Sequence, residues 1–366
     1  MGKGGSAEVL VIGAGIFGLA TALACARRGM SVIVADRAEP GAGASGGPVG
    51  ALSPHPPERW SAKRAFQLET LLAAEGYWAS VAALGGLDPE YGRIGRVIPL
   101  ATPEARALAE ARAVEARALW RGARWTVRAA PPWLATGAAP EGVVWETLSA
   151  RLNPRRAIAA LVAALRALGG ETRPGWRALS AEESGATFDR GRIAAGTVVI
   201  AAGLGGFDLT APGLGRLGKG VKGQAALLAG GGAPGRPMLY ADGLYIVPHA
   251  DGTVAVGATS EADWTDASAT DAALDALMDR ARALRPDLGP VLARWAGVRP
   301  RGPRPDPMLG PLPGQRRVFV ANGGFRTGFG LAPAVGAAMA AMIAGEEPML
   351  PPGFRLTDHL AARRDM

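Results

Sequence analysis

A glycine-rich turn near the N-terminus has the residue types and the spacing that bind the phosphates of a dinucleotide. It consists of Gly13, Ala14, Gly15, Ile16, Phe17 and Gly18. An apolar run before it predicts a strand over 8–12, and the stretch after it predicts a helix over 16–28. In this context the first glycine permits the tight turn, the second lets a pyrophosphate approach the backbone, and the third lets the helix pack on the strand. The helix N-terminus adds amide donors and a positive dipole.

A carboxylate stands where the second strand of such a unit ends. Residues 30–35 predict that strand, and Asp36 follows it, with Arg37 next in the chain. An acid at this place holds ribose hydroxyls in dinucleotide-binding units. With strand, helix and acid all present, the alternative of a purely structural turn is disfavoured. An NAD-binding chain would continue with further strand–helix pairs, whereas here a small-residue segment follows at 40–50, and a late strand ends at 201–203. This arrangement favours FAD.

The composition limits the other kinds of chemistry. The chain has 366 residues and a formal charge of +8, but nearly all of its positive charge is arginine scattered in ones and twos. Because no basic run interleaved with aromatic residues is present, a dedicated nucleic-acid surface is not expected. Cys25 is the single cysteine and there are three histidines, so we expect no disulfide and no metal site.

The apolar run at 9–26 has the length of a membrane span. The glycine turn divides it into a strand-like half and a helical half, whereas a membrane-spanning segment would be one continuous helix. The same division disfavours a signal peptide. We therefore expect a cytoplasmic protein without a membrane span.

The periodicity of apolar residues predicts the remaining elements. Helices are expected at 62–84, 103–121, 148–168, 271–285 and 331–344, the third with Asn153 as its cap and Pro154 in its first turn. Strands are expected as a pair within 91–100 and at 175–181, 187–188, 192–195, 197–200, 291–298 and 317–321. Alternating strands fill 219–258, which predicts an antiparallel sheet.

These elements predict an α/β protein with two interleaved domains. The strand–helix units at the start, middle and end of the chain flank the antiparallel pieces. We expect a discontinuous Rossmann-type FAD-binding domain from 6–80, 150–215 and 305–366. A substrate-binding domain, built on an antiparallel sheet with helices, is expected from 81–149 and 216–304.

Four ordered motifs resemble the D-amino-acid oxidase superfamily of flavoenzymes, which has a glutathione-reductase-like FAD domain, and most closely its bacterial glycine oxidase branch. Besides the N-terminal turn, the motifs are Gly-Leu-Tyr-Ile-Val-Pro at 243–248 with Val-Gly-Ala-Thr at 256–259, Trp-Ala-Gly-Val-Arg-Pro at 295–300, and Gly-Gly-Phe-Arg-Thr-Gly at 323–328. The resemblance covers nearly the whole chain.

The resemblance implies which residues bind the substrate. Arg299 and Arg326 match arginines that hold a substrate carboxylate, for which a guanidinium fork is suited. Tyr245 would hydrogen-bond the same carboxylate or close the pocket. The alternatives are that both arginines are ordinary surface charges and that Tyr245 is a core residue.

The resemblance also implies a non-covalent FAD and the residues around it. Besides the N-terminal turn and Asp36, these are Arg37, Ala44, Ser45, Gly50, Ala51, Leu52, Ala202, Gly203, Gly324, Phe325, Arg326, Thr327, Gly328, Phe329 and Gly330. A helix beginning near Leu331 would direct its positive dipole at the flavin ring and favour the reduced anion; the alternative is a plain strand-to-helix connection. Relatives that bond FAD covalently use a cysteine near the C-terminal segment or a histidine in the loop matching 43–50, and neither is present. His55 lies just beyond that loop, where we expect a structural role, the alternative being a place against the flavin.

The implied reaction is oxidative deamination of a small amino acid or amine of the glycine, sarcosine or D-amino acid type. A hydride passes from Cα to flavin N5, the imine hydrolyses, and oxygen or another acceptor reoxidises the flavin. Two departures keep an alternative open. The segment 43–55 resembles a tRNA-modifying relative that removes a carboxymethyl group from a modified wobble uridine, a carboxymethylaminomethyl-type substrate. Gly324 stands where glycine oxidases tend to carry a histidine. A non-catalytic flavoprotein is the other alternative, and the oligomeric state stays open.

Overall fold

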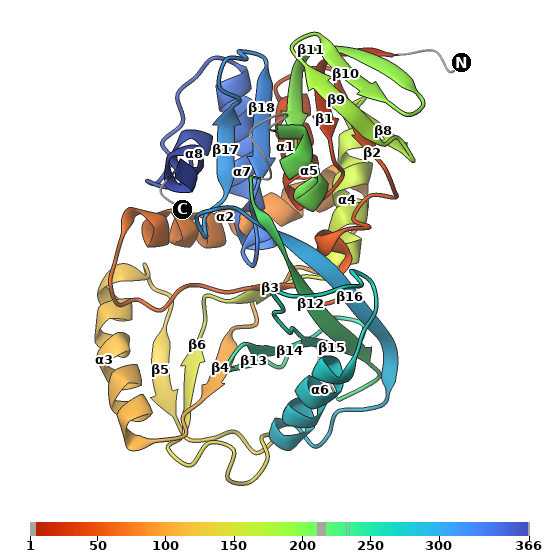
Figure 1. Ribbon diagram of the computed structural model, residues 1–366. Helices are drawn as coiled ribbons and strands as arrows, with labels where there is room; N and C mark the ends of the chain where they lie inside the picture. The colour runs from red at the N-terminus through yellow and green to blue at the C-terminus, as the bar shows by residue number, and fades with distance from the viewer. Residues whose placement is uncertain (1–4, 211–216, 232, 234, 365–366) are drawn as a thin grey trace.

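The computed structural model describes residues 5–210, 217–231, 233 and 235–364, and its strands gather mainly into two large sheets, one above the other in Figure 1. The first sheet has the order β17-β18-β11-β1-β2-β8, and β9 and β10 extend it from β11. Its strands are β1 (Ser6–Ile12), β2 (Val32–Asp36), β8 (Glu171–Pro174), β9 (Ala178–Glu182), β10 (Gly185–Phe188), β11 (Gly191–Ile200), β17 (Met308–Pro311) and β18 (Val318–Asn322). From β18 to β8 the five central strands are parallel.

Alternate residues of these parallel strands pack on opposite faces of the first sheet. Val9 and Val11 belong to the core formed with four helices: α1 (Ile16–Arg27), α2 (Ala62–Gly85), α4 (Pro154–Ala167) and α7 (Gly328–Ile343). Leu10 and Ile12 belong to the opposite core, formed with β10, α5 (Gly203–Thr210) and α8 (Leu356–Arg364). Burial on both faces explains why β1 is a continuous apolar run.

The second sheet has the order β16-β12-β15-β14-β13-β4-β6-β5. Its strands are β4 (Arg96–Pro99), β5 (Trp125–Arg128), β6 (Val143–Glu146), β12 (Lys219–Leu228), β13 (Met238–Ala241), β14 (Leu244–Pro248), β15 (Val254–Gly257) and β16 (Val291–Arg301). All its pairs are antiparallel except β13 with β4. Helix α6 (Ala272–Leu284) packs on one face of this sheet, and α3 (Pro103–Leu119) packs against β5. A short pair, β3 (Ala51–Leu52) with β7 (Ala150–Arg151), completes the strands.

The predicted α/β class is confirmed. Every strand of the first sheet falls within 6–80, 150–215 or 305–366, and every strand of the second within 81–149 or 216–304. These are the ranges expected for the two domains, and we propose this division of the chain into a FAD-binding and a substrate-binding domain.

Several local predictions were wrong. The pair within 91–100 is a single strand, β4, and the helix expected from 148 begins only at Pro154, after β7 and the cap Asn153. The strand expected over 175–181 is β9, which begins only at Ala178, and the expected strands at 192–195 and 197–200 are one strand, β11. Helix α7 starts at Gly328, ahead of the expected 331, and α5, α8, β3, β5, β6, β8 and β17 were not predicted. The missed pieces are short or rich in glycine, where periodicity carries little information.

The N-terminal apolar run is β1, the glycine turn and α1, as the turn predicts. Among the described residues, no helix combines the length and the apolar character that crossing a membrane requires.

A close approach of α1 and α7 generates a stability prediction. A Cβ on Gly336 in α7 would lie 2.5 Å from the carbonyl oxygen of Ala20 in α1. Gly336→Ala should therefore force the helices apart and lower the free energy of unfolding by about 1–3 kcal/mol. Gly76, on the exposed side of α2, meets nothing within 4 Å and is the matched control. Gly76→Ala should raise stability by about 0.5–1 kcal/mol. Thermal unfolding of both variants tests this prediction. Equal changes in stability at the two positions would contradict it.

Candidate active site

The glycine turn between β1 and α1 is built by three different constraints. Gly13 has φ +113°, and a Cβ there would lie 2.4 Å from the carbonyl oxygen of Ala201. A Cβ on Gly18 would lie 1.9 Å from the carbonyl oxygen of Gly13, so this glycine lets the helix rest on the turn. Gly15 differs from both, because the nearest neighbour of a Cβ built there would be Ser45 Oγ at 3.4 Å, which is an ordinary contact. Gly15 therefore keeps open space over the N-terminus of α1, where a phosphate can approach.

Asp36 at the end of β2 is fixed by backbone amides. Its Oδ2 accepts a hydrogen bond from the N–H of Ala14 at 2.7 Å, and its Oδ1 accepts one from the N–H of Ala38 at 2.9 Å. Since a carboxylate has about four acceptor positions, both oxygens keep capacity for ribose hydroxyls. On the other side of the turn, the N–H of Ile16 donates to Ser45 Oγ at 3.0 Å.

One cavity of about 1280 Å³ runs from this turn to the second sheet. The predicted cofactor and substrate residues that line it are Gly13, Gly15, Ile16, Phe17, Asp36, Arg37, Ala44, Ser45, Gly50, Ala51, Leu52, Ala202, Gly203, Tyr245, Arg299, Gly324, Phe325, Arg326, Thr327, Gly328, Phe329 and Gly330. Ala14 and Gly18 are the two that do not line it. Ala14 instead binds the Asp36 carboxylate, and Gly18 packs on Gly13.

Arg299, on β16, presents a half-buried guanidinium to this cavity. Its Nη1 and Nη2 both donate to the carbonyl oxygen of Thr259, each at 3.2 Å. Among the described residues it has no carboxylate within ion-pair distance. Burial, and next the charge of Arg326, lower the pKa of Arg299 to about 10, while Glu261 opposes this shift. Arg299 is thus charged at neutral pH, and an anion bound beside it would neutralise a charge that the fold leaves uncompensated.

Arg326 lies on the loop between β18 and α7. It lines the cavity and is exposed to solvent. Its guanidinium carbon is 5.2 Å from the ring centroid of Phe325, and that of Arg301 is 5.5 Å from the same ring. Phe325 itself has φ +41°, a left-handed conformation that is uncommon outside glycine. The aromatic ring therefore contacts both guanidinium groups, of which that of Arg326 lines the cavity.

Tyr245 on β14 belongs to a buried polar chain that sequence reasoning missed. Its hydroxyl oxygen accepts a hydrogen bond from Nη1 of Arg96 at 3.2 Å. Nε of Arg96 pairs with Oε1 of Glu146 at 3.0 Å, and both side chains are almost fully buried. Burial lowers the pKa of Arg96, but the Glu146 carboxylate and the neighbouring tyrosines outweigh it and hold that pKa above its ordinary value. Arg96 also lines the cavity, yet no motif marks it; only the unusual placement of a charge in an apolar strand could have drawn attention to it.

His55 lines the cavity as well, and its surroundings are those of a structural histidine. Its Nδ1 lies 2.6 Å from Oε1 of Gln67, and its backbone N–H donates to the same oxygen at 2.9 Å. Burial lowers the pKa of His55. The ring is therefore held by Gln67 at the cavity wall.

The residues that line the cavity suit the chemical groups of FAD. The side of Gly15 is open to a pyrophosphate, Asp36 is fixed for ribose, and the same cavity continues between the loop 43–52 and the N-terminus of α7. That helix begins at Gly328, so its free amides lie at the cavity wall, where a flavin ring carrying negative charge would be stabilised.

Comparison with known proteins decides the family. The family model described as FAD dependent oxidoreductase matches residues 8–342. The chain belongs to this family of FAD-dependent oxidoreductases. The predicted resemblance to D-amino-acid oxidases, the FAD cofactor and the oxidoreductase class are thereby confirmed.

Individual members of the family resemble the chain over most of its length. A glycine oxidase of Pseudomonas aeruginosa is 32% identical over 366 residues, covering 95% of this chain and 97% of that protein. The crystal structure of glycine oxidase from Geobacillus kaustophilus superposes with a TM-score of 0.86 at 25% identity, over 97% of this chain and 99% of that one. A bifunctional protein of tRNA 5-methylaminomethyl-2-thiouridine biosynthesis from Magnetococcus marinus is 32% identical over 211 residues, covering 52% of this chain and 29% of that protein.

The open side of Gly15 generates a prediction about the cofactor. Gly15→Leu should fill the space in front of the α1 N-terminus and yield folded but colourless protein. Gly15→Ala is the graded control, since its Cβ makes an ordinary 3.4 Å contact with Ser45 and should reduce flavin content far less. Flavin absorbance per protein, with circular dichroism to verify folding, gives the result. A yellow Gly15→Leu protein would contradict this placement of the phosphates.

The mode of attachment is predicted separately. Because the sequence has no cysteine or histidine where covalent relatives bond the cofactor, acid precipitation should release all FAD into the supernatant. Flavin that stays with the precipitated protein would show a covalent bond.

Proposed function

We propose that this family member oxidises the amine of a small amino acid, of the glycine, sarcosine or D-amino acid type, to an imine that hydrolyses to ammonia or an amine and a carbonyl acid. The observation that carries this proposal is the uncompensated guanidinium of Arg299 in the cavity, with Arg326 close enough to lower its pKa. Both arginines line the same cavity, and neither has a carboxylate partner among the described residues, which supports a carboxylate ligand between them. The glycine oxidases that resemble the chain support the same substrate class.

Three residues of the chain would position the substrate. Arg299 and Arg326 bind its carboxylate, and Arg299 is held by the Thr259 carbonyl while it does so. Tyr245 donates the remaining hydrogen bond. Since Arg96 can only donate, the Tyr245 oxygen must be its acceptor, and the hydroxyl proton of Tyr245 is left to point elsewhere, toward the cavity.

FAD, when bound, supplies the acceptor for the hydride from Cα. The residues of the chain orient the Cα–H bond, and this orientation supplies a large part of the rate. No histidine or carboxylate has to act as a base, because an amine that is neutral when it reacts needs no proton removed first. We also propose that the reaction takes place in the cytoplasm, the compartment that a chain with one cysteine permits.

Anaerobic mixing tests the proposed reaction. The holoenzyme is mixed with glycine, sarcosine, proline or D-amino acids, and loss of the oxidised flavin absorbance reports reduction. At least one small amino acid should bleach the flavin. If none does, the protein is a flavoprotein without this activity.

The arginine pair generates a quantitative prediction. Each charge-assisted hydrogen-bond donor contributes about 1.5–3 kcal/mol in a partly dry site. Arg299→Met or Arg326→Met should therefore weaken binding of glycolate or benzoate about ten- to a hundredfold. Lysine at either position should restore only part of this affinity, because it lacks the guanidinium fork. The flavin absorbance shift on titration measures the affinity, and FAD content should not change. Unchanged affinity in both methionine variants would make these arginines ordinary surface charges.

A second candidate is oxidation of a carboxymethylaminomethyl group on a tRNA uridine by the same site. The similarity to the Magnetococcus marinus protein and the formal charge of +8 favour it. This candidate predicts tRNA binding that weakens steeply with salt. Absence of binding at low ionic strength, measured by fluorescence anisotropy with labelled tRNA, would eliminate it.

A further inference from the structure

The guanidinium of Arg299 rests on a glycine of the neighbouring strand. Arg299 on β16 is opposite Val221 on β12, and its side chain passes over Gly223. A Cβ on Gly223 would lie 2.0 Å from Nη2 and 2.4 Å from Cζ of Arg299. The backbone of Gly223 is not in the left-handed region, so a side chain is excluded here only by the arginine. The glycine thus provides the space that Arg299 occupies.

The carbonyl of Thr259, which accepts both hydrogen bonds of Arg299, is itself held in place. The N–H of Thr259 donates to the carbonyl of Gln224 at 3.1 Å, and the N–H of Gln224 donates to Thr259 Oγ1 at 2.8 Å. The Thr259 hydroxyl in turn donates to the carboxylate of Glu261. Two hydrogen bonds to β12 and one to Glu261 therefore hold Thr259 in place.

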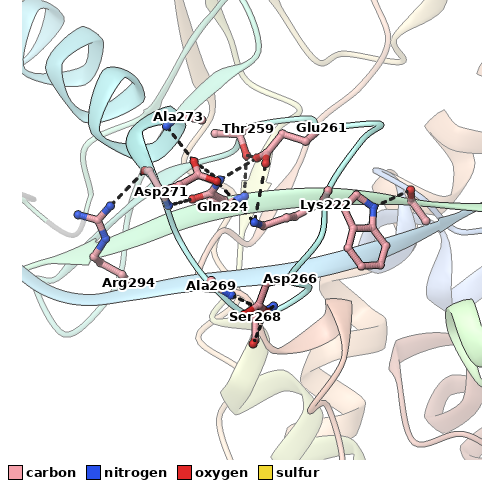
Figure 2. Close-up of polar contacts among 12 residues, drawn as sticks. Lys222, Gln224, Thr259, Glu261, Asp266, Ser268, Ala269, Asp271, Ala273 and Arg294 are labelled. Atoms are coloured by element: carbon pink, nitrogen blue, oxygen red, sulfur yellow. Dashed lines mark hydrogen bonds and ion pairs between the residues drawn. The ribbon is translucent and has the colours of Figure 1, made fainter.

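The side chain of Gln224 joins this segment to the start of α6, as Figure 2 shows. Its Nε2 donates to Glu261 Oε1 at 2.9 Å and to Asp271 Oδ1 at 2.8 Å, and its Oε1 accepts from the N–H of Asp271 at 2.8 Å. Gln224 itself has no exposed surface, whereas its partner Asp271 is exposed, so the three bonds lie at the edge of the buried region. A buried amide with every partner present is a rigid connection.

Lys222 places a positive charge between two carboxylates of this cluster. Its side chain is buried, with Nζ 3.9 Å from Glu261 Oε2 and 3.7 Å from Asp271 Oδ2 (Figure 2). The Gln224 amide and the N–H of Ala273 lower the pKa of Asp271, so the carboxylate stays charged. Lys222 thus neutralises carboxylates that would otherwise repel each other, and it fixes the segment that carries Thr259.

We propose that Gly223, Gln224 and Lys222 are positioning residues that set the place of the Arg299 guanidinium for the substrate carboxylate. The inference rests on the proposed function of Arg299. Gly223 determines how close the guanidinium lies to β12, and the other two fix the carbonyl that orients it. None of the three is expected to touch the substrate.

A double-mutant cycle on the holoenzyme tests the proposal. Gly223→Ala should displace Arg299 and weaken glycolate binding about tenfold or more, with FAD content unchanged. Arg299→Ala removes the side chain that meets position 223. Adding Gly223→Ala to Arg299→Ala should therefore have no further effect on glycolate affinity. Gln224→Met should also weaken glycolate binding, and again only when Arg299 is present.

Arg280→Met is the control, because Arg280 lies on α6 and donates to the carbonyl of Asp242 without touching Thr259, Gln224 or Asp271. It should leave the glycolate affinity unchanged. If Arg299→Ala does not weaken glycolate binding, the proposed function fails. If it does, but Gly223→Ala has no effect, or has the same effect in the Arg299→Ala background, the positioning role is overturned while the proposed function stands.

Discussion

The close approach of α1 to β1 and β11 is the contact on which the rest of the site depends. It requires three backbone segments to meet without side chains between them: Gly18 over the Gly13 carbonyl, and Gly13 against Ala201. Any Cβ at these positions would separate the helix from the sheet. The approach brings the N-terminus of α1 to the carboxyl ends of the parallel strands, so amides, dipole and Asp36 converge at one edge.

The second sheet completes the cavity with a different kind of constraint. Around the cofactor end, glycine removes side chains so that the backbone can approach; around the substrate end, buried charges are fixed by one another. Arg96 is paired with Glu146, and Lys222 with Glu261 and Asp271, whereas Arg299 has no carboxylate partner among the described residues. A buried charge is costly unless it is paired. The pairing therefore separates Arg96 and Lys222, which stabilise the walls of the cavity, from Arg299 and Arg326, which we propose bind the substrate carboxylate.

Much of the site could be predicted because many of its residues lie in short motifs that are contiguous in the sequence. The Gly13–Gly18 turn, Asp36 and the loop at 322–330 are contiguous or nearly so, and each has a mechanism of its own. Arg96 with Glu146, and Gln224 with Asp271, could not be found in this way, since the members of each pair are far apart in the sequence and meet only in the folded protein. In the sequence they look like ordinary polar surface residues. Helix α5 was missed because its glycines suggest a loop, while tertiary packing of Phe207 stabilises it.

The strand order of the first sheet has a consequence for how the protein is made. β1 is the first strand in the sequence and pairs with β2, which follows it closely, but its other neighbour β11 ends at Ile200. The loop 322–330, which also lines the cavity, comes later still. Contacts between such distant segments form slowly, and during synthesis they must wait for the later partner to be available. The N-terminal glycine turn therefore emerges long before it can retain a cofactor. Cofactor binding is a late event in the synthesis of this protein, because the loop 322–330 must leave the ribosome first.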